Sequence, residues 1–265
     1  MNDQVLRITI DGRGVARLTL SRPDVRNAFN EAVIDGICEA FGRFNNDPNV
    51  RIVVLTGVEK TFCAGADLNM MQRAATYSAD DNKDDARRLA HMLHAINNSA
   101  KPVVARVNGP AMGGGVGMVA ACDIAVAAES AFFALSEVRL GLIPAVISPF
   151  VVGAMGPQEA RRWFLTGERF DAETAKRIHL VHMVAMDEQL DATVETVVAS
   201  LLKGGPEAQR ACKTLINAVA HKEINQSVLE DTANRIAQVR AGAEGKEGIA
   251  AFLEKRRPNW VRADD

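Results

Sequence analysis

The sequence predicts an α/β fold in which a core of alternating strands and helices is followed by a region made of helices. Strand-like apolar runs alternate with helical spacing through the first half, and helical spacing then continues almost without interruption from Pro157. No internal repeat or low-complexity linker separates the two parts. We therefore expect a core over residues 1–200 and a C-terminal helical region over residues 201–265.

The core begins with a predicted β-hairpin. In "VLRITI-DGRG-VARLTL", residues 5–20, apolar and polar residues alternate around a glycine-rich turn. Helical spacing of apolar residues follows over residues 30–44. The continuous apolar run "VRIVVLTG", residues 50–57, predicts a strand buried on both faces.

The middle of the chain continues this alternation. Residues 74–85 are acidic and rich in small residues, which predicts a mobile loop before a helix over residues 86–99. A buried strand, "KPVVARVNG", leads into a glycine-rich loop, a short apolar helix and the strand "DIAVAA". Later helices are expected to begin near the following residues, several of which are common at helix N-termini: Pro157, Asp171, Asp187, Pro206 and Asn225.

Composition excludes several classes of protein. The 265 residues carry 31 basic and 33 acidic side chains, so nothing favours nucleic acid or an anionic membrane surface as a partner. No run reaches the ~18 apolar residues of a membrane-spanning helix, and residues 1–12 lack a secretion signal. The four cysteines form no CxxC pair, which fits reduced thiols and a cytoplasmic location. Two HxxH pairs lack a third ligand, so we expect no metal.

A glycine-rich loop opens a helix at "RVNGPAMGGGVGMVAACDI", residues 106–124. Backbone N–H groups at such a helix N-terminus attract negative charge. A nucleotide-binding P-loop is excluded because no Lys-Ser or Lys-Thr follows the glycines. Gly115, Gly117 and Ala120 spell a dinucleotide fingerprint, with Glu137 as its ribose-binding acid, although the strand ends too far upstream. A third interpretation is that the glycines only allow close helix packing.

A second loop, "FCAGADL" at residues 62–68, also follows a buried strand. Its small residues leave backbone N–H groups accessible. Two N–H groups from separate loops that converge on one oxygen form an oxyanion hole. Each donor typically contributes about 2.7–4 kcal/mol of transition-state stabilisation.

Four motifs in this order resemble the crotonase superfamily, whose best-known members are enoyl-CoA hydratases and isomerases. The motifs are "FCAGADL" (62–68), "NGPAMGGG" (108–115), "CDI" (122–124) and "SEVRLGLIP" (136–144). The resemblance implies a spiral of ββα units with a C-terminal helical trimerisation region. It also implies an acyl-CoA thioester as substrate, no separate cofactor, and assembly as a homotrimer or a dimer of trimers.

The resemblance places the N–H groups of Ala66 and Gly114 in the oxyanion hole and makes Glu137 the general acid and base. Typical hydratases carry a second glutamate three residues after the oxyanion-hole glycine, where this chain has Gly117. Met112, Gly113 and Gly117 would line the substrate pocket. We expect a side chain at Gly113 or Gly114 to occupy the space of the thioester. We expect Gly117 to free volume for a branched acyl chain.

The same resemblance assigns the coenzyme A contacts. Arg26 and Ala28 would border the CoA chain. Three residues of the first loop, Ala64, Asp67 and Leu68, would lie along its adenine and pantetheine. Phe252 and Lys255 would cover the adenine and 3′-phosphate, often from a neighbouring subunit, and the basic run 255–257 suits a phosphate.

The favoured function is hydration of a 2-enoyl-CoA. The segments "GGGVGMVAACDIAVAA" and "SEVRLGLIPAVISPFVV" resemble bacterial hydratases of methylglutaconyl-CoA or carboxygeranoyl-CoA, which favours a branched acyl chain. An enoyl-CoA isomerase is the second hypothesis, because shifting a double bond needs only one base. A non-catalytic acyl-CoA-binding protein is the third, and an NAD-dependent dehydrogenase is the fourth.

Overall fold

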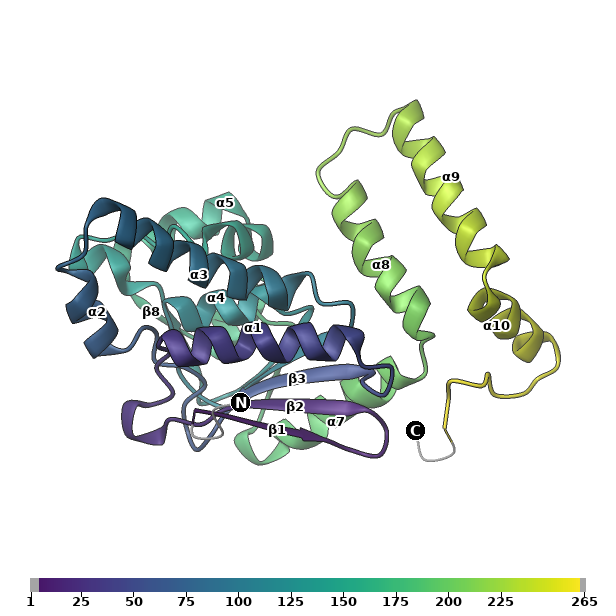
Figure 1. Ribbon diagram of the computed structural model, residues 1–265, viewed down its shortest axis with the longest axis horizontal. Coiled ribbons are helices and arrows are strands. Elements are labelled where there is room, and N and C mark those ends of the chain that lie inside the picture. Colours follow the sequence, from purple (N-terminus) through teal and green to yellow (C-terminus); the bar gives the residue numbers. More distant parts are fainter. Residues whose placement is uncertain (1–4, 263–265) are drawn as a thin grey trace.

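The computed structural model describes residues 5–262, so residues 1–4 and 263–265, the outer ends of the two predicted regions, lie outside the described residues. Two parts are visible: a core of sheets and helices, and a group of helices that projects from it (Figure 1). The predicted α/β class is confirmed. The helix boundaries and the details of the connections differ from the prediction at several places.

The main sheet has the order β1-β2-β3-β4-β6-β9. β1 pairs antiparallel with β2, which confirms the hairpin, and the other neighbours are parallel. Its strands are β1 (Leu6–Ile10), β2 (Val15–Leu20), β3 (Ile52–Gly57), β4 (Val103–Val107), β6 (Ile124–Ala128) and β9 (Met183–Ala185). A smaller sheet has the order β5-β7-β8, formed by β5 (Ala111–Met112), β7 (Phe132–Ala134) and β8 (Arg169–Asp171).

Helices cover both faces of the main sheet. On one face pack α1 (Glu31–Asn46), α3 (Ala79–Asn97), α4 (Gly114–Ala121) and α5 (Ser148–Thr166), and on the other α7 (Leu190–Leu202) (Figure 1). β3 contributes side chains to the packing on both faces of the sheet, because successive strand residues point to opposite faces. Val53 and Leu55 belong to the α1 side, whereas Ile52 and Val54 pack with α7. This double burial explains the uninterrupted apolar run.

The prediction of a mobile loop over residues 74–85 is wrong. α2 (Leu68–Ala74) precedes it, and α3 already begins at Ala79. Ser78 accepts a hydrogen bond from the Asp81 N–H, and the Asp81 carboxylate accepts one from the Ser78 N–H. This capping box, with its acidic first turn, stabilises the helix N-terminus. The acidic composition therefore marked a helix start rather than a loop.

The second half also differs in its boundaries. α5 begins at Ser148, and the predicted start at Pro157 is instead a kink, where Gly156 has φ 77°. β8 and β9 interrupt the stretch expected to be helical. The remaining short elements are α6 (Ala172–Arg177), which Asp171 caps as expected, and 3-10 helices at Pro23–Val25, Ser136–Leu140 and Asp187–Gln189.

The helical arm, residues 206–253, projects from the core and returns to it (Figure 1). It comprises α8 (Pro206–Val219), α9 (Gln226–Ala241) and α10 (Ala243–Leu253). Both of its ends meet at the buried side chain of Arg51. The Arg51 guanidinium donates to the carbonyls of Leu202 (3.3 Å) and Gly204 (2.9 Å) before the arm, and to that of Trp260 (3.0 Å) after it. One side chain of the core thus holds both ends.

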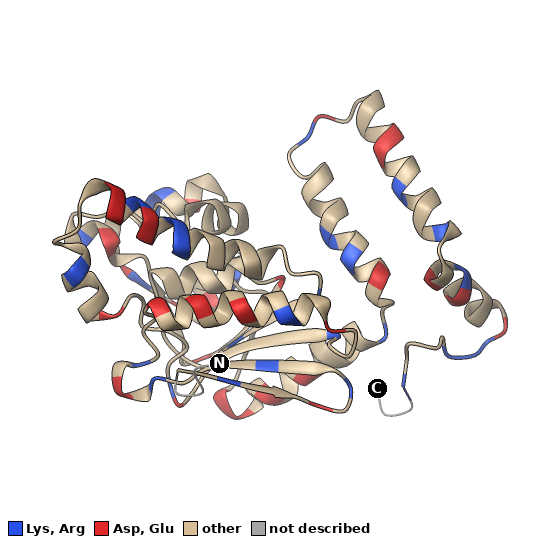
Figure 2. Ribbon diagram, viewed as in Figure 1, with Lys and Arg blue, Asp and Glu red and all other residues tan. Residues whose placement is uncertain are grey.

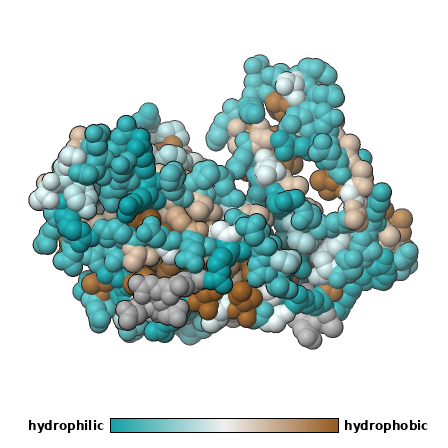
Figure 3. Space-filling view, in the orientation of Figure 1, coloured by the Kyte–Doolittle hydropathy of each residue, from teal (hydrophilic) through white to brown (hydrophobic). Residues whose placement is uncertain are grey.

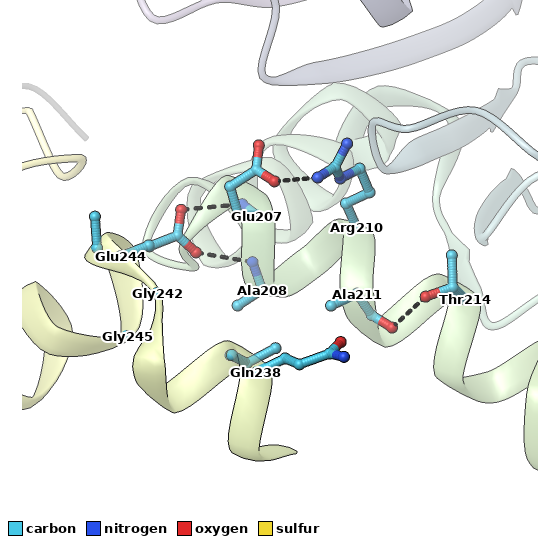
Figure 4. A pocket seen from close by; sticks show the side chains of 11 residues that line it. Glu207, Ala208, Arg210, Ala211, Thr214, Gln238, Gly242, Glu244 and Gly245 are labelled. Atoms are coloured by element: carbon cyan, nitrogen blue, oxygen red, sulfur yellow. Dashed lines mark hydrogen bonds and ion pairs between the residues drawn. The ribbon is translucent and has the colours of Figure 1, made fainter. Parts of the chain in front are cut away.

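A second contact fastens α10 to the first turn of α8 (Figure 4). The Glu244 carboxylate accepts hydrogen bonds from the N–H groups of Glu207 (3.0 Å) and Ala208 (2.8 Å). A carboxylate at this place also complements the helix dipole. The cavity of about 580 Å³ beside it is lined by α8 and by the α9–α10 junction.

The helical arm exposes large apolar side chains to solvent. Hydrophobic residues, coloured brown, lie among polar ones on this part of the molecule (Figure 3). Seven large apolar side chains of the arm are exposed: Ile216, Ile224, Leu229, Ile236, Ile249, Phe252 and Leu253. Both signs of charge occur on the outer helices of the core, where the acidic residues of α1 precede its one basic residue, Arg43 (Figure 2). No helix within residues 5–262 combines the length and apolar character needed to cross a bilayer.

Candidate active site

The two loops singled out in the sequence lie against each other. Phe62 N–H and Cys63 N–H both donate to the Pro110 carbonyl at 3.1 Å, and Met112 N–H donates to the Cys63 carbonyl at 2.9 Å. Cys63 and Ala111 form a parallel bridge between the loops. These bonds bring the backbone that precedes Ala66 next to the backbone that precedes Gly114.

Close approach of the loops requires glycine at two positions. A Cβ on Gly115 would lie 2.7 Å from the Cys63 carbonyl oxygen, and Gly65 has φ 94°, a conformation that favours glycine. Cys63 itself is fully buried, and this burial raises the pKa of its thiol to about 12. Such a thiol stays protonated and serves as a small packing group rather than a nucleophile.

The N–H groups of Ala66 and Gly114 have no acceptor among residues 5–262. Gly114 is the first residue of α4, where a helix leaves its N–H groups unbonded. Ala66 lies in a bridge to Phe29, in which the Gly65 carbonyl and the Asp67 N–H form the bonds and the Ala66 N–H forms none. Each loop therefore offers a main-chain donor.

Glu137 lies in the 3-10 helix that follows β7, and its carboxylate reaches the glycine loop. A Cβ on Gly113 would lie 3.0 Å from Glu137 Oε1. Within the described residues, Glu137 Oε2 is buried and has no hydrogen-bond partner. Burial raises the pKa of this carboxyl above its ordinary value, because the charged form loses hydration that the hydrogen bond from its own backbone N–H only partly replaces. A half-buried, unpaired carboxyl of this kind is typical of a proton-transfer group.

The glycines of the loop have different neighbours from those expected. At Gly113, an added Cβ would contact Glu137, which fits a position lining the site. At Gly114 it would lie 2.5 Å from the Phe29 ring, so packing against the segment before α1 requires this glycine. At Gly117 it would lie 2.4 Å from Ile147 Cγ2, so the expected free volume does not exist. Ile147 fills that space.

Gly115, Gly117 and Ala120 lie inside α4. A dinucleotide fingerprint needs its first glycines in the tight turn between a strand and a helix. These three residues therefore spell the motif without having its geometry.

Asp67 has a structural role that the sequence did not reveal. Its carboxylate pairs with Arg22 at 2.7 Å, accepts a hydrogen bond from the Asn69 N–H and is 3% exposed. Burial alone would raise the pKa of this carboxyl, but Arg22 and the Asn69 N–H outweigh burial and hold it below its ordinary value. Asp67 is thus the N-cap residue of α2, and its side chain is buried. The next residue, Leu68, is exposed.

Three predicted contact residues meet at one cavity. Arg26, Ala64 and Met112 line a cavity of about 370 Å³ beside the two loops. Arg169, from β8, also lines it, with its guanidinium 4.7 Å from the centroid of the Phe132 ring. The two arginine side chains make the cavity suitable for an anion. Arg169 was missed because nothing in a short strand distinguishes a ligand-facing arginine from a solvated one.

The remaining predicted contacts lie elsewhere. Phe252 is 82% exposed near the end of α10, and α10 is far from α2 and the two loops in one chain (Figure 1). Lys255 follows α10 with φ 55°. Next to it, Arg256 is held by Glu247 and Glu254, so the basic run is partly neutralised. Ala28 is buried, and its carbonyl accepts a hydrogen bond from Arg22.

The histidines of the HxxH pairs have other surroundings. The Ala125 N–H donates to His182 Nδ1 at 3.1 Å, which ties β6 to the chain before β9. Among residues 5–262, no group of three histidine, cysteine or acidic side chains is arranged to hold a metal ion.

Comparison with known proteins agrees with this geometry. The family described as Enoyl-CoA hydratase/isomerase matches residues 11–263. A crotonyl-CoA hydratase from Syntrophomonas wolfei is 32% identical over 249 residues, covering 93% of this chain and 94% of that protein. A mevalonyl-coenzyme A hydratase from Aspergillus fumigatus is 35% identical over 251 residues, covering 92% and 90%. The crystal structure of an enoyl-CoA hydratase from Shewanella pealeana superposes with a TM-score of 0.95 at 40% identity, covering 98% and 97%.

The α/β fold, the two loops that each carry an N–H group without an acceptor among residues 5–262, and the half-buried Glu137 carboxyl agree with a crotonase-type protein. The chain belongs to the enoyl-CoA hydratase/isomerase family, and the three relatives described above are hydratases by name. The resemblance stated from the four motifs is thereby confirmed at the level of the superfamily.

Proposed function

We propose that the protein adds water across the 2,3 double bond of a 2-enoyl-CoA. The observation that carries the proposal is the half-buried carboxyl of Glu137, whose Oε2 atom is buried without a hydrogen-bond partner, whose pKa is raised and which lies against Gly113. Next to Gly113, the N–H of Gly114 has no acceptor within the described residues, and neither has that of Ala66. A carboxyl able to exchange a proton beside two free donors is suited to chemistry through an enolate.

In the proposed reaction, Ala66 and Gly114 donate to the thioester oxygen. The Glu137 carboxylate takes a proton from water while the water oxygen bonds to C3. The electron pair of the double bond moves toward the thioester oxygen, which becomes an enolate. Glu137 then returns the proton to C2 and is a carboxylate again, so one water molecule is added and the enzyme is unchanged.

Coenzyme A would be held beside the same loops, and no separate cofactor is required. Arg26 and Arg169 line the cavity next to Ala64 and would pair with phosphate groups. Leu68 is exposed at the start of α2, where it could cover an apolar part of the ligand. Ala28 and Asp67 would contribute through their backbone, since the side chain of Asp67 is bound by Arg22.

The proposal includes assembly as a homotrimer or a dimer of trimers. The exposed apolar residues of the helical arm would be covered by other subunits, and burial of such area stabilises an interface. Phe252 and Lys255 would then approach the CoA site of a neighbouring subunit. The unpaired cysteines fit a reducing compartment such as the cytoplasm.

A branched acyl chain remains part of the proposal and rests on the likeness of "GGGVGMVAACDIAVAA" and "SEVRLGLIPAVISPFVV" to hydratases of branched substrates. Free volume at Gly117 no longer supports it, since Ile147 fills that space. Relatives named for both crotonyl-CoA and mevalonyl-coenzyme A are similarly distant.

A double-bond isomerase is the second candidate, and one observation favours it. The Glu137 carboxyl lies against Gly113, and position 117, one turn further along α4, is a glycine without a carboxyl. One base suffices to remove a proton from C2 of a 3-enoyl-CoA and return it to C4 while the double bond moves to C2–C3. The donors of Ala66 and Gly114 would stabilise the same enolate.

One experiment separates the candidates. The purified protein is incubated with crotonyl-, 3-methylcrotonyl-, methylglutaconyl- and 3-hexenoyl-CoA, and the products are identified by mass spectrometry and chromatography. Hydration predicts 3-hydroxyacyl-CoA products, and isomerisation predicts 2-hexenoyl-CoA. Glu137→Gln should abolish either activity, whereas Glu129→Gln, at an exposed position, should not. CoA binding without turnover would identify a non-catalytic homologue, and full turnover by Glu137→Gln would refute the proton assignment.

A further inference from the structure

Ile147 is the neighbour that decides what position 117 can carry. It is 3% exposed and lies immediately before α5, and its carbonyl accepts hydrogen bonds from the N–H groups of Phe150 and Val151. An added Cβ on Gly117 would lie 2.4 Å from Ile147 Cγ2 and 2.8 Å from its Cβ. Both atoms belong to the rigid, branched part of the isoleucine side chain. Ile147 cannot move away by rotating a flexible tip.

Glu137 and Ile147 contact successive turns at the N-terminus of α4, Glu137 at Gly113 and Ile147 at Gly117. The Gly117 N–H donates to the Gly113 carbonyl at 3.2 Å, so one helical turn separates the two glycines. Gly113 faces Glu137, and Gly117 faces Ile147. Beside the single carboxyl, the next turn of α4 is therefore sealed by an apolar side chain. Any larger residue at position 117 would need the space that Ile147 fills.

We propose that Ile147 is a specificity-determining residue that restricts the site to one proton-transfer group. This inference rests on the proposed function, because it concerns the same acyl-CoA site. Ile147 and Gly117 act as a matched pair: the glycine exists because the isoleucine fills its side-chain space, and the isoleucine keeps a second carboxyl out. Glu137 alone then performs both proton transfers.

The first test measures stability and does not depend on activity. Gly117→Ala should lower the melting temperature strongly in the presence of Ile147 and much less in the Ile147→Ala background, because the new methyl group enters the space vacated there. Gly153→Ala is the matched control, since a Cβ at that α5 glycine has no neighbour within 4 Å. It should leave the melting temperature unchanged or raise it. Equal effects of Gly117→Ala in both backgrounds would overturn the pairing.

The second test measures chemistry on crotonyl-CoA. Gly117→Glu alone should reduce the yield of folded protein and give no gain in hydration. Gly117→Glu combined with Ile147→Ala should fold and hydrate at least about a hundred times faster than Ile147→Ala alone, the lower end of the usual range for one general acid-base group. Its pH profile should gain a second ionisation. A Gly117→Glu single variant as stable and as active as the wild type would overturn the inference and leave the proposed function intact. Absence of wild-type turnover on every enoyl-CoA tested would overturn both.

Discussion

Replacing Arg51 with methionine should weaken the attachment of the helical arm to the core. Methionine keeps much of the side-chain volume but removes the donors that bond to the carbonyls of Leu202, Gly204 and Trp260. A buried acceptor left without its donor costs about 1–3 kcal/mol. Because two of these three carbonyls lie near the surface and can be rehydrated, we take about 1 kcal/mol for each. The expected loss is about 3 kcal/mol of unfolding free energy.

The assay is denaturant unfolding at fixed protein concentration, since any assembly would make stability depend on concentration. Arg51→Lys is the control. It keeps the charge but replaces the planar fork with a single ammonium, which cannot reach three carbonyls in the same geometry. We expect an intermediate loss for this variant. An Arg51→Met protein within about 0.5 kcal/mol of the wild type would refute the reasoning, because that is the scatter of ordinary surface substitutions.

Three further variants test the site. Glu137→Gln should be more stable than the wild type at neutral pH and equal to it below about pH 4. Because the pKa of Glu137 is raised in the folded protein, its contribution to the free energy of unfolding is fully present below the ordinary pKa of 4.5 and is lost as pH rises through the folded pKa. Melting temperatures of both proteins across this pH range measure the difference. Asp67→Asn should destabilise at pH 7, with a difference that shrinks as pH falls below 3.8, because the lowered pKa reports the pair with Arg22; urea titrations at several pH values would show it. Gly114→Ala should lower stability by about 1–3 kcal/mol through overlap with the Phe29 ring, measured by denaturant unfolding, and a neutral outcome would mean that the ring can move away.

Patterns with a direct physical cause were the ones that could be predicted. The hairpin follows from the alternation of apolar and polar residues, and the buried β3 strand from a continuous apolar run. The pairing of the two glycine-rich loops follows from residues small enough to let two backbone segments approach each other closely. Glu137 was found because a motif placed it, and the structure adds its burial and its unbonded oxygen.

The errors came from contacts between distant parts of the chain. The acidic segment before α3 has the composition of a loop, and only the reciprocal Ser78–Asp81 bonds show that it starts a helix. Gly117 suggested empty space, because nothing in the sequence indicates that Ile147, thirty positions later by the numbering, packs onto it. Arg22 was missed for the same reason, since its partner Asp67 comes from another loop. Long-range packing decides such positions, and local spacing does not record it.

The fastening of the helical arm at both ends has a topological consequence. Its outer turn, residues 220–225, is exposed and lies at the farthest point from the two places where Arg51 and Glu244 hold the chain. Opening the backbone there would leave each fragment anchored by its own end. We therefore expect a circular permutant with new termini in this turn to fold, and to lose assembly if other subunits cover Ile224 as proposed.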